Sequence, residues 1–98
     1  MKIEFTNRAV RDLREISGYC RKQFGDRVTA ALEARIRDVA TDIAVYPERA
    51  PRVEGRAGMR VVPLVRYPFK IFYRIVSDTV RIVHIRHVAR RPWTGGAQ

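Results

Sequence analysis

Residues 80–94 read VRIVHIRHVARRPWT, and this stretch combines a strand pattern with a concentration of positive charge. Apolar residues alternate along its first part, which is typical of a β-strand with one buried face. It then contains both histidines of the chain, several arginines and the only tryptophan, and no acidic residue follows Asp78. We therefore expect this strand to supply core residues on one face and a positive surface on the other.

The chain has 98 residues, 46% of them apolar, which is enough for one domain with a modest core. We predict a single domain over residues 1–98. The 20 basic and 10 acidic residues give a formal net charge of +10, and most of the excess lies after residue 46. This asymmetry indicates an anionic partner such as nucleic acid, a membrane surface or an acidic protein segment. A solvated basic surface that only maintains solubility is the alternative.

Targeting signals and disulfide pairs are not evident in the sequence. Charged residues interrupt the N-terminal segment, so no secretory signal is predicted, and no apolar run is long enough to span a membrane. Cys20 is the only cysteine, which suits a reducing compartment, and its place on a helix face favours a core residue over a nucleophile. We expect a cytoplasmic protein.

The first half predicts a short strand followed by two helices. Residues 2–5 alternate as a strand does, and Thr6 is suited to cap the helix that follows. Apolar residues at three- and four-residue steps predict helices before and after Gly25, and Pro47 ends the second. So short a connection makes the two helices an antiparallel hairpin. The predicted inner residues are Val10, Leu13, Ile16, Ser17, Cys20 and Phe24 in the first helix, and Val28, Ala31, Leu32, Ile36, Val39, Ile43 and Tyr46 in the second.

The second half predicts a loop and three strands. Residues 47–58 are rich in proline, glycine and charge, as in a loop, and alternation then favours strands over residues 60–65, 69–76 and 79–88. Short connections make these strands an antiparallel meander. Pro63 lacks an amide donor and indicates an edge or a bulge. The predicted fold is α+β with the order β-α-α-β-β-β, a helical hairpin packed on one face of a small, mainly antiparallel sheet.

Alternation assigns the strand faces. In the middle strand, one face carries Phe69, Ile71, Tyr73 and Ile75, and we expect it to pack against the helices. In the last strand the pattern is less distinct, and we place Val83 and Ile85 against the helices. His84 and Arg86 then lie on the open face beside Lys70 and Arg74.

The basic residues of this open face form the candidate binding site. Arginine suits phosphate or carboxylate because its planar fork donates two parallel hydrogen bonds. Phe72 and Trp93 lie in the same region, as in surfaces that stack nucleic-acid bases. Ordinary exposed arginines, with Trp93 closing the edge of the core, are an equally open interpretation. The candidate residues are Arg60, Lys70, Arg74, His84, Arg86, Arg90, Arg91 and Trp93.

His84 and His87 are candidates for acid–base chemistry because their unperturbed pKa lies near neutrality. RNA cleavage without a metal needs a base, an acid and cations around the phosphorane. Their odd spacing, however, directs the two rings to opposite faces of a regular strand, and a structural role for each is the alternative. No cluster of metal ligands and no glycine-rich phosphate loop is present, so we expect no metal and no cofactor.

Several segments in this order resemble the RelE/ParE superfamily of type II toxin–antitoxin toxins, also called plasmid stabilisation proteins. The resemblance rests on the spacing of Ala9 to Leu13, the helix end at Tyr46, the strand YPFKIFYRI at residues 67–75 and the closing VRIVHIRHVARRPW. It covers almost the whole chain. It implies the β-α-α-β-β-β fold and a growth-inhibiting toxin, held inactive in a hetero-oligomeric complex by a cognate antitoxin with a DNA-binding part and an acidic or amphipathic C-terminal segment.

The superfamily divides into two activities. RelE-type members cleave mRNA on the ribosome with basic residues of the sheet face and, in many cases, a tyrosine near the C-terminus, whereas ParE-type members poison DNA gyrase and lack that set. Here Lys70 falls at a RelE-type arginine position, and Arg90 falls near the basic residue after the last strand. Arg60 matches one lysine position, but Val62 stands two residues on, and no tyrosine follows Arg91.

The resemblance therefore favours a ParE-like toxin that inhibits gyrase by binding to it, and it leaves open whether the chain is an enzyme. The alternative is a metal-independent, ribosome-dependent mRNA endonuclease, for which the catalytic candidates are His84, His87, Lys70 and Arg90. A third possibility is an inactive toxin homologue that only binds the antitoxin and regulates the operator.

Overall fold

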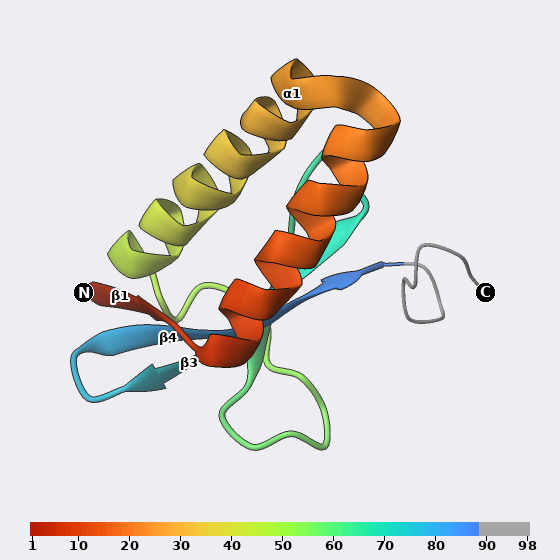
Figure 1. Ribbon diagram of the computed structural model, residues 1–98. Helices are drawn as coiled ribbons and strands as arrows, with labels where there is room; N and C mark the ends of the chain where they lie inside the picture. The colour runs from red at the N-terminus through yellow and green to blue at the C-terminus, as the bar shows by residue number, and fades with distance from the viewer. Residues whose placement is uncertain (89–98) are drawn as a thin grey trace.

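The computed structural model describes residues 1–88 and has two layers, a bent helix and a four-stranded sheet (Figure 1). Its elements are β1 (Lys2–Phe5), α1 (Asn7–Val45), β2 (Arg60–Pro63), β3 (Phe69–Val76) and β4 (Thr79–His87). α1 covers one face of the sheet, and within the described residues no helix covers the other, which we call the open face. The predicted fold class and order of elements are confirmed.

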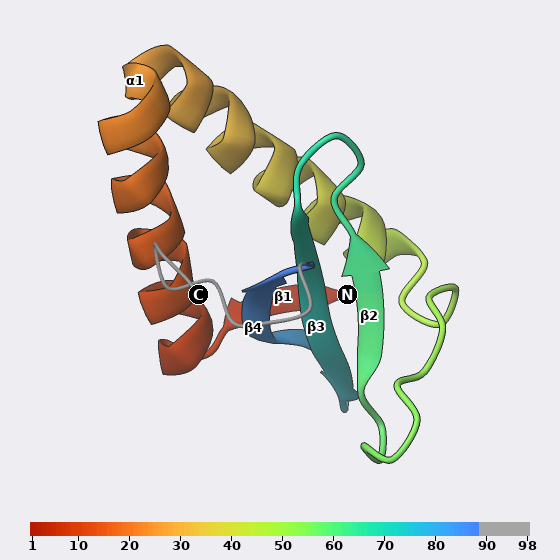
Figure 2. The same ribbon diagram turned by 90° about the vertical axis from the view of Figure 1, so that its right-hand side faces the viewer.

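α1 is bent into two arms at Gly25. The backbone there has φ 89° and ψ 177°, a conformation that interrupts the helix and that only glycine adopts readily. Residues 7–24 form the first arm, which leads away from the sheet to the bend, and residues 26–45 form the second arm, which returns toward the sheet (Figure 2). Thr6 caps the first arm, because its hydroxyl accepts a hydrogen bond from the amide of Ala9 at 3.1 Å. The predicted hairpin and cap are therefore confirmed, with one residue as the turn.

The buried side of both arms matches the predicted stripe near the sheet but not at the ends. Ile16, Cys20, Leu32, Ile36, Val39 and Ile43 are buried in one core cluster. Phe24 and Val28, however, are 64% and 40% exposed, and they flank the bend at Gly25, the part of α1 that lies farthest from the sheet (Figure 1). Tyr46 is also exposed, and its ring lies under the guanidinium of Arg49 at 4.2 Å. The prediction was wrong for these residues and for Ala31.

The strand order in the sheet is β1-β4-β3-β2. β2 with β3 and β3 with β4 are antiparallel, as the predicted meander requires. β1 pairs with β4 in parallel, with Lys2 opposite Thr79 and Phe5 opposite Ile82. β4 is therefore an inner strand for its first four residues. Pro63 is the last residue of the edge strand β2, as its missing amide indicated, although that strand ends two residues earlier than predicted.

The core lies between α1 and the sheet, and β3 forms its floor. Phe69, Ile71 and Tyr73 alternate toward α1 and are buried, as predicted. The hydroxyl of Tyr73 donates a 2.6 Å hydrogen bond to the carbonyl of Pro47, just after the end of α1. Burial raises the pKa of this phenol, while the positive charge of Arg60 opposes the shift. Tyr73 thus fastens the chain leaving α1 to the middle of the sheet.

Candidate functional site

The open face gathers basic side chains from two neighbouring strands. Lys70 of β3 lies opposite Arg86 of β4, and Arg74 lies opposite Arg81. Lys70, Arg74 and Arg86 are exposed, whereas Arg81 forms an ion pair with Glu4 of β1 at 3.0 Å. The prediction that Lys70, Arg74 and Arg86 share one face is confirmed. This face therefore presents cations without a helix to cover them.

A β-bulge at Val83 changes the direction of the side chains in β4. The pairing passes from Phe72 opposite His84 to Tyr73 opposite Ile82, so Val83 is the additional residue. Ile82 before the bulge and Ile85 after it both face the core and are buried. The prediction was right for Ile85 and wrong for Val83, which is only partly buried. Strict alternation cannot place both Ile82 and Ile85 on the core side, because the bulge inserts one residue between two regular segments of β4.

The start of α1 holds this bulge in place. The hydroxyl of Thr6 donates to the carbonyl of Val83 at 2.8 Å, and a carboxylate oxygen of Asp12 accepts from the amide of Ile85 at 3.1 Å. Beyond Phe5, β1 no longer pairs with β4, so these side chains satisfy backbone groups that a strand would otherwise satisfy. The first arm of α1 is thus fastened to the part of β4 that carries His84 and Arg86.

His84 lies on the open face, as predicted, but it is covered. Its ring stacks on Phe72 with 4.5 Å between ring centres and 2° between planes, and the residue is 2% exposed. Neither ring nitrogen has a hydrogen-bond partner among the described residues. Burial lowers the pKa of His84 to about 4, and the positive charges of Arg8, Arg86 and Arg56 contribute further. The imidazole is therefore neutral at neutral pH.

His87 lies on the opposite face of β4. It is paired with Phe69, and the two rings meet edge to face with centres 5.4 Å apart. Because Phe69 faces α1, His87 is separated from His84 by the sheet itself. The odd spacing in the sequence predicted this separation correctly. The two histidines cannot act on one phosphate as an acid–base pair.

Arg60 is not part of the open face, which corrects the sequence prediction. In the pairing of β2 with β3 it lies opposite Tyr73, on the side of α1. One guanidinium nitrogen donates to the carbonyl of Ala50 at 2.7 Å and to that of Glu48 at 3.1 Å. Arg60 therefore holds the chain that follows α1. The face of the sheet on which Arg60 lies depends on the register of the edge strand β2, which the sequence did not reveal.

Two basic residues near His84 were missed by the sequence prediction. Arg8 lies in the first turn of α1, and Arg56 lies in the segment that joins α1 to β2. That segment extends to the side of the open face (Figure 1), where the carbonyl of Ala57 accepts from the Arg74 guanidinium at 3.4 Å. A cation in the first turn of a helix is unfavourable, and this was a signal for Arg8. No comparable signal marks Arg56. The remaining predicted residues, Arg90, Arg91 and Trp93, lie outside the described residues.

A hollow lies between the second arm of α1 and the edge strand β2. It is a cavity of about 380 Å³ with mainly apolar walls. Val39 and Ile43 of α1 and Val61 and Val62 of β2 line it, and the charged residues Arg35, Asp42 and Arg49 also contribute to its walls. Apolar walls with a few charged groups are typical of a site that receives a ligand or a segment of another protein.

Metal clusters and membrane spans are not found in the described part of the chain. Within residues 1–88, no group of three or more histidine, cysteine, aspartate or glutamate side chains is arranged to hold a metal ion. No helix in this part has both the length and the apolar character needed to cross a membrane.

Comparisons with known proteins agree on one kind of protein. A family model described as "ParE toxin of type II toxin-antitoxin system, parDE" matches residues 3–92. A chain of the chromosomal ParDE toxin–antitoxin system from P. aeruginosa is similar in structure, with a TM-score of 0.79 and 24% identity over 90% of this chain and 96% of that one. A comparison with curated protein sequences gave no match.

Two further solved structures share the fold with lower TM-scores. A chain of the RelBE2 toxin–antitoxin complex from Mycobacterium tuberculosis has a TM-score of 0.61 and 25% identity, covering 88% of this chain and 95% of that one. The isolated RelE toxin from E. coli has a TM-score of 0.60 and 15% identity, covering 92% of this chain and 86% of that one. Such likeness at low identity establishes the architecture rather than the target.

Proposed function

The chain belongs to the ParE toxin family of type II toxin–antitoxin systems, and from this premise we propose that it arrests growth by inhibiting DNA gyrase. The observation that carries the proposal is the dispersal of the residues that RNA cleavage would need. Gyrase inhibition acts through binding to a protein, so it requires an accessible surface and no acid–base pair.

Three residues support this choice over the ribonuclease alternative. His84 is neutral and covered, and His87 lies on the other side of the sheet. Arg60 is turned toward the carbonyls of Glu48 and Ala50. A general base must reach the proton that it removes, and the cations must surround the phosphate. Lys70 and Arg86 remain on the open face, but His84, the histidine on that face, is covered.

The open face is the proposed contact surface for the target. Lys70, Arg74 and Arg86 are exposed there, and within residues 1–88 none of them forms an ion pair. Exposed cations steer association with an acidic surface and add specificity. No carboxylate among these residues neutralises their charges, so they are available for binding, although Arg74 also donates a hydrogen bond to the carbonyl of Ala57.

We also propose a cognate antitoxin as partner, in a hetero-oligomeric complex. The basic character of the chain favours an acidic segment, and the apolar cavity beside β2 suits the apolar side of an amphipathic one. The similar chains from P. aeruginosa and M. tuberculosis come from a ParDE system and a RelBE2 complex, respectively. A disordered segment that folds as it binds can cover such a broad surface.

Gyrase supercoiling with purified components tests the proposed target. Increasing amounts of the protein should stop supercoiling of relaxed plasmid, and ribosome-bound mRNA should remain intact in a parallel translation reaction. Unimpaired supercoiling together with cleaved mRNA would establish the ribonuclease alternative instead. If both reactions are unaffected while the antitoxin still binds, the chain is an inactive homologue.

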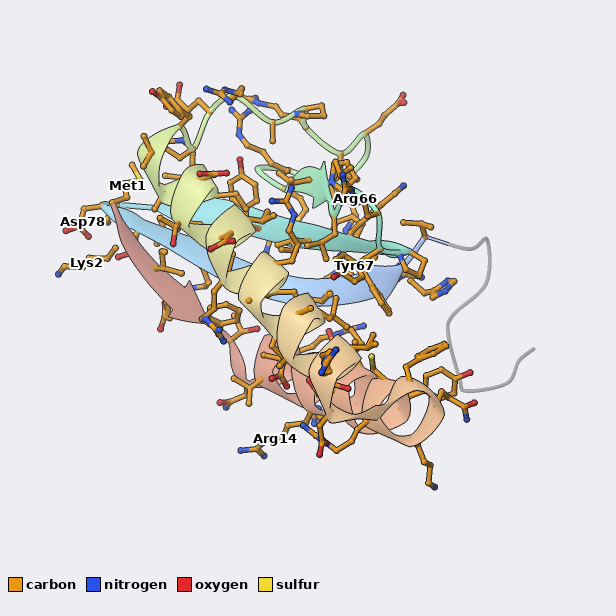
Figure 3. All side chains as sticks on the ribbon, turned by 90° about the horizontal axis from the view of Figure 1, so that it is seen from above. Met1, Lys2, Arg14, Arg66, Tyr67 and Asp78 are labelled. Atoms are coloured by element: carbon orange, nitrogen blue, oxygen red, sulfur yellow. The ribbon has the colours of Figure 1, made fainter. Side chains whose placement is uncertain are left out.

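A charge-reversal pair tests the open face itself. Lys70→Glu should weaken gyrase inhibition, because it places a negative charge in the proposed contact. Arg14→Glu is the matched control, since Arg14 is exposed on α1 and points outward from the molecule (Figure 3). Equal loss of inhibition in both variants would show that general charge, rather than the open face, binds the target.

A further inference from the structure

We propose that the open face carries a phosphate-binding site formed by the guanidinium groups of Arg8, Arg56 and Arg86 around the covered imidazole of His84. The site shares His84 and Arg86 with the predicted set of strand residues and adds two arginines from outside the sheet. It does not depend on gyrase being the target.

Three separate elements bring these arginines together. Arg86 follows His84 by two residues on the same face of β4. Arg8 belongs to the first turn of α1, which Thr6 and Asp12 fasten to the backbone of β4 on both sides of His84, at the carbonyl of Val83 and the amide of Ile85. Arg56 approaches from the segment between α1 and β2. Its neighbour Ala57 is held to the open face by the hydrogen bond from Arg74.

Little negative charge balances this group. Within residues 1–88, Arg56 and Arg86 have no ion pair, and Arg8 has one contact with Asp12 at 4.0 Å. The same Asp12 oxygen already accepts a hydrogen bond from the amide of Ile85. Like charges held close together repel one another, so an anion between them would stabilise the arrangement.

His84 provides the independent indication of a ligand. It is 2% exposed, and neither of its ring nitrogens has a hydrogen-bond partner among the described residues. Buried polar groups in native proteins nearly always have partners, and exceptions often mark a bound ion or a functional site. The arginines that depress the pKa of His84 are the same three residues, so the unpaired ring lies within their field. The imidazole can hydrogen-bond to an anion, and the surrounding cations can balance its charge.

The geometry favours phosphate over carboxylate. A carboxylate has two oxygens in one plane and is satisfied by the fork of a single arginine. A phosphate has several oxygens arranged as a tetrahedron, and guanidinium groups that arrive from three elements can each bind a different pair. α1 adds to the preference, since its N-terminal turn contains no acidic residue and helix N-termini favour phosphate.

A bound phosphate would change the titration of His84 in a characteristic way. The anion would offset the positive charge of Arg8, Arg56 and Arg86, which holds the pKa of His84 down, and its oxygens would accept a proton from the charged ring. The pKa of His84 should then rise by about one unit or more, as expected for an opposite charge placed near an ionisable group. Burial would still keep it below the ordinary value.

The test follows the ring signal of His84 by NMR in the full chain, with inorganic phosphate as the probe and sodium chloride at equal ionic strength as reference. His84→Phe identifies the signal by its loss. Phosphate should raise the pKa of His84 in the unmodified protein and in Arg14→Gln, but not in Arg56→Gln or Arg86→Gln. Thermal unfolding near neutral pH provides a second measurement: phosphate should raise the melting temperature of the first two proteins only.

Separate arms of the experiment distinguish the source of the phosphate. If a short DNA oligonucleotide shifts the His84 signal at a lower concentration than inorganic phosphate, the site takes a backbone phosphodiester. A response to inorganic phosphate alone indicates a small phosphate compound, and either result supports the site. An equal shift with sodium chloride, an equal shift with a glutamate-rich peptide, or no shift with any phosphate would overturn the assignment.

Discussion

Acidification should destabilise this protein through His84 in particular. In the folded chain, burial and three arginines hold the pKa of His84 at about 4, whereas the pKa of a solvent-exposed histidine is 6.5. The unfolded chain therefore binds a proton at pH values where the folded chain does not. The stability contributed by the neutral ring is fully present above about pH 6.5, falls as the pH decreases, and is lost by about pH 4.

The size of the effect follows from the difference between the two pKa values. At 1.36 kcal/mol per unit, the shift corresponds to about 3 kcal/mol of unfolding free energy. That is a large fraction of the stability of a small domain, which is typically about 5–15 kcal/mol. Because burial is the leading cause, most of the effect should persist at high salt, whereas the part caused by Arg8, Arg56 and Arg86 should be screened.

Urea unfolding at a series of pH values measures this effect against His84→Phe. A phenyl ring retains the stack on Phe72 and has no group to protonate. Between pH 6.5 and 4 the unmodified protein should lose about 3 kcal/mol more than the variant. His87→Phe serves as the control and should keep the steep dependence, since His84 is intact. If His84→Phe loses stability as steeply as the unmodified protein, protonation of His84 does not cause the pH dependence, which contradicts the conclusion that His84 is covered and unpaired. Phosphate must be absent from all buffers.

Three substitutions test the contacts that shape the fold, each by chemical or thermal unfolding. Gly25→Ala should destabilise the protein by about 1–3 kcal/mol, because the backbone conformation at Gly25 is strained for any other residue. Gly18→Ala, within the regular part of the helix, is the control and should stabilise the protein by up to about 1 kcal/mol. Equal effects of the two substitutions would mean that the bend is not at Gly25. Asp12→Ala should lower the free energy of unfolding by about 1–3 kcal/mol, because it leaves the amide of Ile85 unpaired. Asp12→Asn keeps an oxygen that can accept this hydrogen bond and should retain most of the stability. If Asp12→Asn is as unstable as Asp12→Ala, the charge of Asp12 matters rather than the hydrogen bond. Tyr73→Phe should cost about 1–2 kcal/mol by removing the hydrogen bond to Pro47, and an unchanged midpoint would show that this carbonyl has another partner.

Much of the fold was predictable because local patterns agree with the final packing. β3 alternates regularly, and its apolar side became the floor of the core. Gly25 marked the turn between the helical arms, and Thr6 marked the start of the first. Each of these features depends on residues close together in the sequence, so the periodicity or the residue type contains the information.

The predictions from the sequence were wrong where segments distant in the sequence determine which face a side chain occupies. The bulge at Val83 depends on Thr6 and Asp12 of α1, which no pattern within β4 reveals. The face of Arg60 depends on the register of a short edge strand. The apolar residues Phe24 and Val28 continue the helical stripe beyond the end of the sheet, so the stripe is longer than the surface that it can cover.

The candidate site was only partly predictable for the same reason. Lys70, Arg74 and Arg86 were placed correctly because two of them share β3 and the third lies after the bulge, where the shifted alternation happened to agree. Arg8 and Arg56 were missed because a helix and a loop bring them to the sheet. A site assembled from several elements requires the tertiary structure before its members can be recognised.

The parallel pairing of β1 with β4 has a consequence for how a newly made chain becomes active. Synthesis produces residues 2–5 first, but their partners at residues 79–82 emerge only after α1, β2 and β3. The helical hairpin consists of local contacts and can form early, whereas contacts between distant segments form slowly. The bulge in β4 is held by Thr6 and Asp12, which follow β1 directly in the chain, so we expect it to form when this part of the chain joins β4. We therefore expect the open face to reach its final form only in this last joining step.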